Sequence, residues 1–256
     1  MNRFSANLGF LWTDRDLPEA IHAAADAGFD AVEFHWPYDV PPNAVRAALE
    51  VKGLPLMGLN TRRGDLAAGE NGLTALPGRQ AEARAAIDEA LAYSSEVGAA
   101  SVHVMAGFAK GPEAEKAYVD GLCYACDEAN KMGKTILIEP LNRHDAPGYF
   151  LETTDQAAEL IASIVAPNLK LMFDCYHVGR TEGDITTRLE ALLPVIGHIQ
   201  IARVPDRGPP QGGEVNYAYI FEVLQGLGWS KPIGAEYKPE GATDESLDWL
   251  NLFRAV

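Results

Sequence analysis

The sequence predicts a single (β/α)8 barrel, an α/β fold in which eight parallel strands alternate with eight helices. Eight short apolar runs alternate with eight stretches of helical pattern along the 256 residues. Their average interval of about thirty residues is the length of one strand–helix repeat, and eight such repeats close a parallel barrel. An open doubly wound sheet usually has fewer repeats and a GxGxxG motif after its first strand, which is absent here. No linker interrupts the series, so residues 1–256 are expected to form one domain.

The eight predicted strands are short and rich in aliphatic or aromatic residues, as buried parallel strands usually are. The fifth has the clearest end, because Glu139 and then Pro140 follow Ile136-Leu137-Ile138, and proline cannot continue a central strand. The predicted strands cover residues 4–10, 31–36, 54–60, 100–105, 136–138, 169–174, 196–201 and 233–237.

Capping residues or prolines precede several of the predicted helices, and glycine follows four of them. Residues 61–77 form a long polar loop rich in glycine, and loops of this length inside compact domains often cover or line a binding site. The helices are predicted over residues 17–27, 41–51, 79–97, 112–132, 154–165, 184–193, 216–227 and 244–253.

Composition narrows the class of protein. The formal net charge of −15 argues against broad binding to nucleic acid or to acidic membranes, because phosphate groups require a positive surface. No run of about 20 apolar residues predicts a membrane helix, and residues 1–5 lead into a strand rather than a signal peptide. Cys123, Cys126 and Cys175 show no secreted spacing pattern, so a cytoplasmic protein is expected. Cys123 and Cys126 fit buried helix positions better than a redox or zinc site. The oligomeric state stays open, a homo-oligomer included.

Four oxygen-bearing side chains stand at the carboxyl ends of the last four predicted strands. These are Glu139, Asp174, Gln200 and Glu236. Active sites of α/β barrels lie at this end, and neighbouring strands are only about 5 Å apart. Three carboxylates so close would raise one another's pKa values, and a divalent cation would relieve the repulsion. Oxygen ligands favour Mg²⁺ or Mn²⁺, although Zn²⁺ or Co²⁺ is also compatible. The alternative is that each acid pairs with a nearby arginine or lysine.

Two further side chains follow these acids closely. His177 comes three residues after Asp174, and Lys238 comes two residues after Glu236. Alone, either would be read as an ordinary loop residue. Beside a cluster of oxygen ligands, both are candidates for binding a substrate.

The chain resembles the hydroxypyruvate isomerase branch of the xylose isomerase-like barrels over nearly its whole length. The long loop from Gly64 through Arg79 is the most distinctive matching segment. The other matching motifs are Arg3-Phe4-Ser5-Ala6-Asn7-Leu8, Val32-Glu33-Phe34, Pro37-Tyr38-Asp39, Ile138-Glu139-Pro140-Leu141-Asn142, Asp174-Cys175-Tyr176-His177, Gly197-His198-Ile199-Gln200-Ile201-Ala202, Gly213-Glu214-Val215-Asn216-Tyr217 and Glu236-Tyr237-Lys238-Pro239.

The resemblance implies a role for each candidate. Glu139, Asp174, Gln200 and Glu236 would ligate the metal, and Glu139 and Glu236 would also exchange protons with the substrate. Related ketose epimerases usually carry histidine where this chain has Gln200, which marks the isomerase branch. They contact sugar hydroxyls at the positions matching Asp145 and His177. One departure is Ala202-Arg203-Val204-Pro205, where the branch commonly has Ala-Asp-Asn-Pro, and this puts the substrate more in question than the reaction.

The implied reaction is the aldose–ketose-type isomerisation of hydroxypyruvate to tartronate semialdehyde through an enediolate. Lys238, Arg203 or an arginine of the loop at 62–63 could bind the substrate carboxylate. The main alternatives are a 2-oxo-tetronate isomerase and a ketose epimerase, the latter disfavoured by Gln200. A zinc-dependent apurinic endonuclease of the same fold would need a basic DNA-binding face. A non-catalytic binding module would be expected to lack one of the two glutamates.

Overall fold

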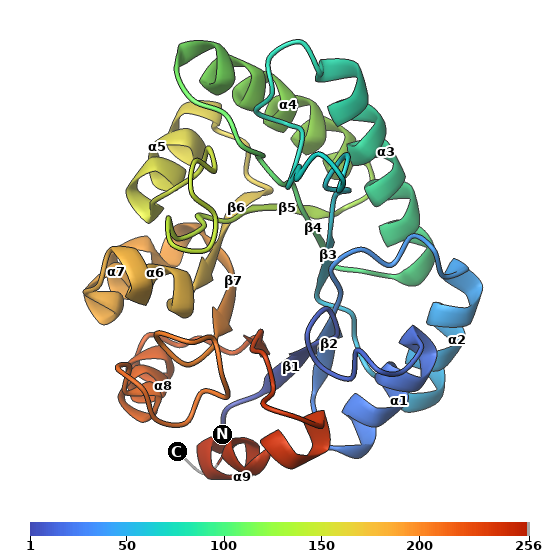
Figure 1. Ribbon diagram of the computed structural model, residues 1–256, viewed down its shortest axis with the longest axis vertical. Helices are drawn as coiled ribbons and strands as arrows, with labels where there is room; N and C mark the ends of the chain where they lie inside the picture. The colour runs from blue at the N-terminus through green and yellow to red at the C-terminus, as the bar shows by residue number, and fades with distance from the viewer. Residues whose placement is uncertain (255–256) are drawn as a thin grey trace.

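A computed structural model describes residues 1–254 as a barrel of eight parallel strands (Figure 1). The order of the strands is β2-β1-β8-β7-β6-β5-β4-β3. Hydrogen bonds from Val32 N to Pro55 O (3.1 Å) and from Met57 N to Val32 O (2.8 Å) join the two edges of the sheet. The strands are β1 (Phe4–Asn7), β2 (Ala31–Glu33), β3 (Gly58–Asn60), β4 (Ser101–His103), β5 (Thr135–Ile138), β6 (Leu169–Asp174), β7 (Ile196–Ile201) and β8 (Ile233–Ala235).

Helices surround the barrel and bury their apolar faces against it (Figure 1). At the start of the chain, the Phe4 ring makes edge contacts with Phe221 and Trp249, which fixes the last two helices against β1. The helices are α1 (Leu17–Asp26), α2 (Pro42–Lys52), α3 (Gln80–Val97), α4 (Pro112–Lys131), α5 (Thr154–Ile164), α6 (Cys175–Thr181), α7 (Ile185–Leu192), α8 (Tyr217–Gly226) and α9 (Asp248–Arg254), with 3-10 turns at Leu193–Val195 and Thr243–Ser246. None of the helices within residues 1–254 is both long and apolar enough to span a membrane.

The predicted barrel is confirmed, with two differences in the helices. The short helix α6 was not predicted. It begins directly after β6 because the Asp174 side chain accepts a hydrogen bond from Tyr176 N (2.8 Å) and caps it. The last predicted helix, 244–253, is instead a 3-10 turn followed by α9. Residues 255–256 of the predicted domain lie outside the described part of the chain.

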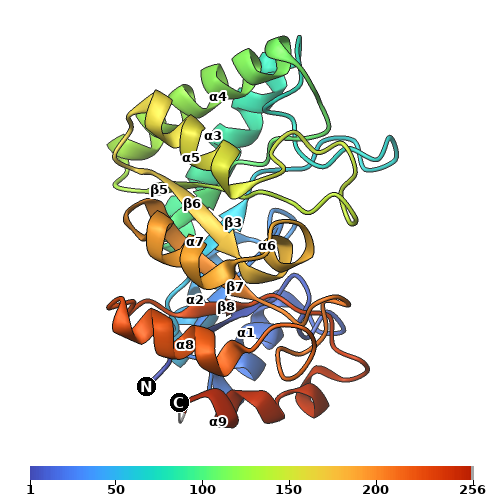
Figure 2. The same cartoon turned by 90° about the vertical axis from the view of Figure 1, so that its left-hand side faces the viewer.

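The loops that follow the strands gather on one side of the barrel, to the right in Figure 2, and the N-terminus lies toward the other side. The longest of these loops joins β3 to α3, and hydrogen bonds and an ion pair fix its shape. Arg63 O accepts a hydrogen bond from Gly72 N (2.8 Å), and Gly72 bridges to Ala106 just beyond β4. The Glu70 carboxylate accepts from Asp65 N (2.7 Å) and pairs with Arg79 (2.8 Å). The loop therefore has a defined shape over the barrel end.

Gly72→Ala is expected to lower the free energy of unfolding by about 2–4 kcal/mol. Gly72 has φ +117°, and a Cβ there would lie 2.7 Å from backbone atoms of Met105 and Gly107. Chemical denaturation measures the effect. Gly69→Ala is the matched control, because Gly69 has φ +76° but open space around it, so only the backbone penalty of about 1 kcal/mol applies. Equal losses in the two variants would contradict the packing argument.

Candidate active site

The four predicted strand-end side chains lie at the same end of the barrel. Asp174 is the last residue of β6 and is in register with Gln200 of β7, while Glu139 and Glu236 directly follow β5 and β8. All four are buried, with at most 5% of each residue exposed. The parallel strands thus place three carboxylates and one carboxamide together where water cannot fully solvate them.

A cavity of about 170 Å³ opens at this end, and Glu139 and Glu236 both line it. Of the predicted substrate-binding residues, His177 and Asp145 also line it. Gln200 lies deeper, in a second cavity inside the barrel that shares Asn60 and His103 with the first. The other lining residues of the outer cavity are Phe10, His35, Trp36, Asn60, Asn71, His103, Met105, Leu141, Ala146 and Arg207.

Several buried polar atoms here have no hydrogen-bond partner among the described residues. They are Glu139 Oε1, Asp174 Oδ2, His177 Nε2 and Gln200 Oε1. His177 Nε2 lies 3.8 Å from the Glu139 oxygen and 3.6 Å from the Asp174 oxygen. Buried polar groups without partners are rare, and such a group calls for an explanation, such as a catalytic role or a bound water or ion.

Burial and mutual repulsion disfavour the charged forms of Glu139 and Asp174. Burial, reinforced by the charges of Glu236 and Asp174, raises the pKa of Glu139 well above its usual value. Burial also raises the pKa of Asp174 to about 7, although Arg207 opposes the shift. A divalent cation among these oxygens would compensate the buried charge and supply the missing partners. The donor set therefore fits such an ion.

Glu236 has the opposite environment. Burial by itself would raise its pKa, but the charge of Arg207 and a hydrogen bond from His35 outweigh burial and lower the pKa well below the usual value. Its Oε1 accepts a hydrogen bond from Asn7 Nδ2 (2.9 Å) and contacts His35 Nε2 (2.8 Å), and its Oε2 pairs with Arg207. Glu236 is therefore held firmly at both oxygens, whereas Glu139 Oε1 has no hydrogen-bond partner among the described residues.

The orientation of the His177 ring determines whether its Nε2 atom donates a hydrogen bond or ligates a metal. Its Nδ1 accepts hydrogen bonds from Asn142 N (3.0 Å) and Asn142 Nδ2 (2.8 Å). Burial, followed by the charge of Arg207, lowers the pKa of His177 to about 3, so the ring is neutral. A neutral imidazole with an accepting Nδ1 carries its proton on Nε2. The atom facing Glu139 and Asp174 is therefore a hydrogen-bond donor and not a free metal ligand.

The basic side chains that were predicted to bind the substrate carboxylate lie at different distances from the cavity. Arg203 pairs with Asp206 (2.5 Å) and Glu240 (2.6 Å) and is not among the residues lining the outer cavity. Lys238 is exposed at the rim, with Nζ 5.7 Å from the Phe10 ring centre. Arg207, which the sequence reading missed, lines the cavity and lies against the Phe10 and Tyr176 rings. Nothing in its loop sequence distinguishes Arg207 from an exposed arginine.

In the sequence, Glu33, His35, Asn60 and His103 lie on early strands, where they were candidates only as further ligands of a zinc endonuclease, and polar residues of these strands also reach the site. His35 and Asn7 hold Glu236, as described above. His103 is buried, neither of its ring nitrogens has a hydrogen-bond partner within residues 1–254, and burial lowers its pKa to about 4. Its Nδ1 lies 3.7 Å from Glu139 Oε2. Their position in the sequence could have indicated a role, because these polar residues also stand at or near the ends of strands.

A family model described as the xylose isomerase-like TIM barrel matches residues 21–253. The chain is 44% identical to the 2-oxo-tetronate isomerase of Cupriavidus necator over 99% of each chain. It is 37% identical to the hydroxypyruvate isomerase of Escherichia coli over 99% of this chain and 100% of the other.

Among solved structures, one described as AP endonuclease, family 2, from Brucella melitensis is 36% identical over 99% of each chain, with a TM-score of 0.95. A D-psicose 3-epimerase from Clostridium cellulolyticum shares the fold at 16% identity, with a TM-score of 0.84 over 99% of each chain. These matches confirm the predicted fold class and the resemblance seen in the motifs. The chain belongs to the xylose isomerase-like TIM-barrel family and is an isomerase.

Proposed function

We propose that the protein interconverts a small 2-oxo hydroxy acid and its isomeric aldehyde, with hydroxypyruvate and tartronate semialdehyde as the pair. The observation that carries this proposal is the presence of two buried glutamates, Glu139 and Glu236, on the wall of one small cavity. Isomerisation requires a proton to leave one carbon and another to reach its neighbour, so two carboxyl groups suit it. The names of the relatives from C. necator and E. coli support the substrate class.

Glu139, Asp174, Gln200 and Glu236 would hold a divalent ion, with Mg²⁺ or Mn²⁺ favoured by oxygen ligands and Zn²⁺ or Co²⁺ compatible. Such an ion supplies Lewis-acid polarisation of the substrate carbonyl and offsets the negative charge of an enediolate. The unpartnered oxygens of Glu139, Asp174 and Gln200 support this assignment.

The two glutamates divide the proton transfer. One removes a proton from the hydroxyl-bearing carbon, the electrons of that C–H bond form the enediolate, and the other glutamate protonates the neighbouring carbon. The proton of the original hydroxyl oxygen passes to the original carbonyl oxygen, so the first becomes the carbonyl oxygen of the product and the second becomes a hydroxyl. His177 Nε2–H, fixed by Asn142, donates a hydrogen bond to one of these oxygens. Asp145, which accepts from Tyr176 Oη (2.8 Å), contacts a substrate hydroxyl.

Arg207 is the cation that we assign to the substrate carboxylate. It is the arginine that lines the outer cavity among the described residues, and its ion pairs with Glu236 and Asp174 hold it there. An arginine offers a planar fork that matches a carboxylate. Arg203 pairs with Asp206 and Glu240 and does not line the outer cavity, so it is less suited to this role.

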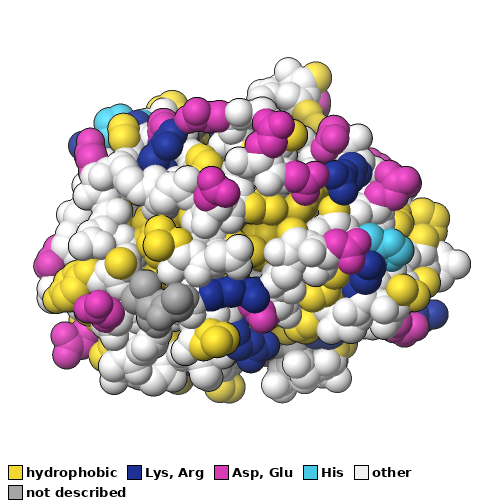
Figure 3. Space-filling model, turned by 90° about the horizontal axis from the view of Figure 1, so that it is seen from below, with side chains coloured by type: hydrophobic (Ala, Val, Ile, Leu, Met, Phe, Trp, Pro, Cys, Tyr) yellow, Lys and Arg dark blue, Asp and Glu magenta, His cyan; other side chains and the backbone are white. Residues whose placement is uncertain are grey.

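A 2-oxo-tetronate isomerase is the second candidate, because the relative from C. necator carries that name. A nuclease is disfavoured by the net charge of −15. On the face shown in Figure 3, acidic side chains are scattered among the basic ones, and no continuous basic patch spans that face.

Glu236→Gln is expected to lower kcat with hydroxypyruvate by about 10²–10⁴-fold, because a carboxamide cannot exchange a proton with the substrate carbon. Product formation in a coupled assay measures the loss. Glu240→Gln is the control, since Glu240 is an exposed glutamate beyond the same strand. Near-normal turnover by Glu236→Gln would eliminate the two-glutamate mechanism.

Arg207→Lys is expected to raise KM by about tenfold or more, because lysine loses the bidentate contact with a carboxylate. The matched control is Arg203→Lys, which changes the same chemical group outside the cavity and should leave KM near the normal value. If the KM of the Arg203 variant rose while that of the Arg207 variant did not, the assignment would be reversed.

Asp174→Asn is expected to stabilise the metal-free protein at neutral pH. Because burial raises the pKa of Asp174 from 3.8 to about 7, the folded protein holds this proton to higher pH than the unfolded chain. The contribution of Asp174 to stability therefore falls as pH rises through this window, by about 4 kcal/mol in total for a shift of this size. Denaturation in the presence of a chelator measures the free energy of unfolding. Between about pH 4 and 7, its value for the variant should increase relative to its value for the unmodified protein. If the free energies of unfolding of the two proteins changed in parallel with pH, the burial cost assigned to the Asp174 charge would be contradicted.

A further inference from the structure

We propose that Glu33 is a positioning residue that orients the carboxamide of Gln200 so that its oxygen faces the carboxylate cluster. This inference rests on the proposed function, in which Gln200 is a ligand. Glu33 stands at the end of β2, and it does not line the outer cavity. It would act through Gln200 and would not touch the substrate.

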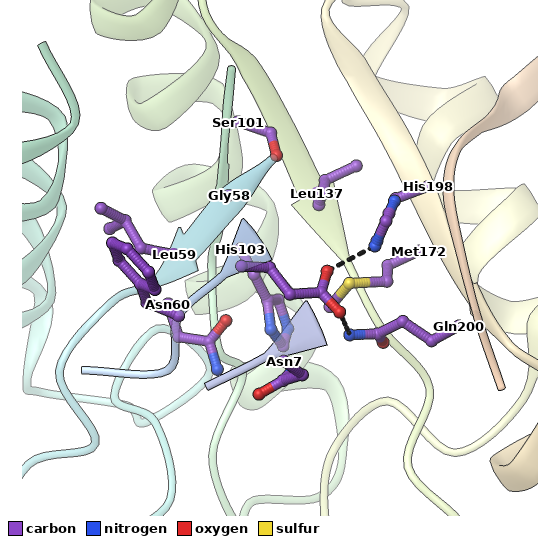
Figure 4. A pocket seen from close by; sticks show the side chains of 12 residues that line it. Asn7, Gly58, Leu59, Asn60, Ser101, His103, Leu137, Met172, His198 and Gln200 are labelled. Atoms are coloured by element: carbon purple, nitrogen blue, oxygen red, sulfur yellow. Dashed lines mark hydrogen bonds and ion pairs between the residues drawn. The ribbon is translucent and has the colours of Figure 1, made fainter. Parts of the chain in front are cut away.

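The contacts form a small buried triad inside the barrel. Figure 4 shows His198 and Gln200 reaching from one strand, each joined by a dashed line to a carboxylate between them, which belongs to Glu33. His198 Nε2 lies 2.5 Å from Glu33 Oε2, and Gln200 Nε2 lies 3.4 Å from Glu33 Oε1. The three residues are 2–4% exposed.

The chemistry of the two groups determines which way the amide points. A carboxylate offers only hydrogen-bond acceptors, so the part of a carboxamide that faces it must be the NH₂ group. His198 takes the other oxygen of Glu33, leaving Oε1 for Gln200. The carboxamide oxygen of Gln200 is then directed away from Glu33, and it has no hydrogen-bond partner among the described residues. Without Glu33, the amide could rotate and present NH₂, which cannot ligate a cation.

The backbone makes space for this arrangement. Two strands, β1 and β8, lie between β2 and β7 in the sheet, and Glu33 must cross β8 to reach Gln200. It crosses at Gly234, which is in register with Gln200. A Cβ at Gly234 would lie 2.3 Å from Glu33 Oε1 and 2.8 Å from Gln200 Cγ. The absence of a side chain at Gly234 therefore permits the contact.

A purely structural role for the Glu33–His198 pair is the competing explanation. Buried ion pairs are often worth little net stability compared with apolar residues of similar size. The two explanations differ in what happens when the hydrogen bond is rebuilt with reversed polarity. In the double variant Glu33→Gln/Gln200→Glu, the new amide donates to the new carboxylate, and the net charge of the protein is unchanged.

Binding of Mn²⁺ alone to the full-length, metal-free protein, measured by calorimetry, tests the inference. Glu33→Gln should weaken Mn²⁺ binding by about tenfold, the usual effect of removing a group that orients a ligand. The double variant should recover most of that loss. Glu182→Gln is the matched control, because the Glu182 side chain is 6% exposed, pairs with Arg188 and lines neither cavity, so its loss should leave Mn²⁺ binding unchanged. Unaltered binding by Glu33→Gln, or a double variant as weak as the single one, would overturn the inference.

A second measurement needs no metal. In protein labelled with ¹⁵N-glutamine, the Gln200 side-chain NH₂ signal is identified by its absence from Gln200→Glu. We expect slow solvent exchange of this NH₂ group in the unmodified protein and faster exchange in Glu33→Gln. Equal exchange would refute the orientation by Glu33. If the exchange rates differ while the unmodified protein binds no Mn²⁺, the orientation holds and the metal of the proposed function fails.

Discussion

Repulsion among buried carboxylates is the constraint on which the site depends. Glu139, Asp174 and Glu236 arrive from three strands, at the same end of the barrel and out of contact with bulk water. Arg207 offsets part of this charge, but the pKa of Glu139 and of Asp174 remains raised by burial and by neighbouring acids. A fold evolved for stability alone would gain nothing from such a cluster, since uncompensated buried charge costs several kcal/mol. Its presence is best explained by the chemistry that it permits.

The rest of the structure controls the direction in which each polar group points. Asn7, His35 and Arg207 fix Glu236, while Asn142 fixes the proton of His177 on the nitrogen that faces the acids. Within the barrel, the Glu33–His198 pair faces the NH₂ group of Gln200. Rigid strands and hydrogen bonds thus preorganise donors and acceptors around a small cavity, and such preorganisation is the usual source of electrostatic catalysis.

The barrel and the strand-end acids could be predicted because both follow from local patterns. Apolar runs such as Ile136-Leu137-Ile138 mark buried strands, and parallel strands bring their ends together whatever the intervening loops do. The role of Arg207 could not be predicted, since it depends on a loop in which this residue adopts φ +60°. The same holds for Asn142 and Glu33, whose partners lie 35 and 167 residues away. Only the folded chain shows which of several nearby cations reaches the cavity.

The central claim is that the two glutamates move a proton between adjacent carbons of a small 2-oxo hydroxy acid. It is tested most directly by incubating the enzyme in deuterated water with a panel of three- and four-carbon 2-oxo hydroxy acids and ketoses, with and without divalent cation. Mass spectrometry would then measure deuterium at the carbon next to the carbonyl, which detects proton removal even where the overall equilibrium is unfavourable. The account predicts exchange into hydroxypyruvate or its four-carbon analogue that depends on the cation. Exchange confined to the ketoses, or none in any compound of the panel, would contradict it.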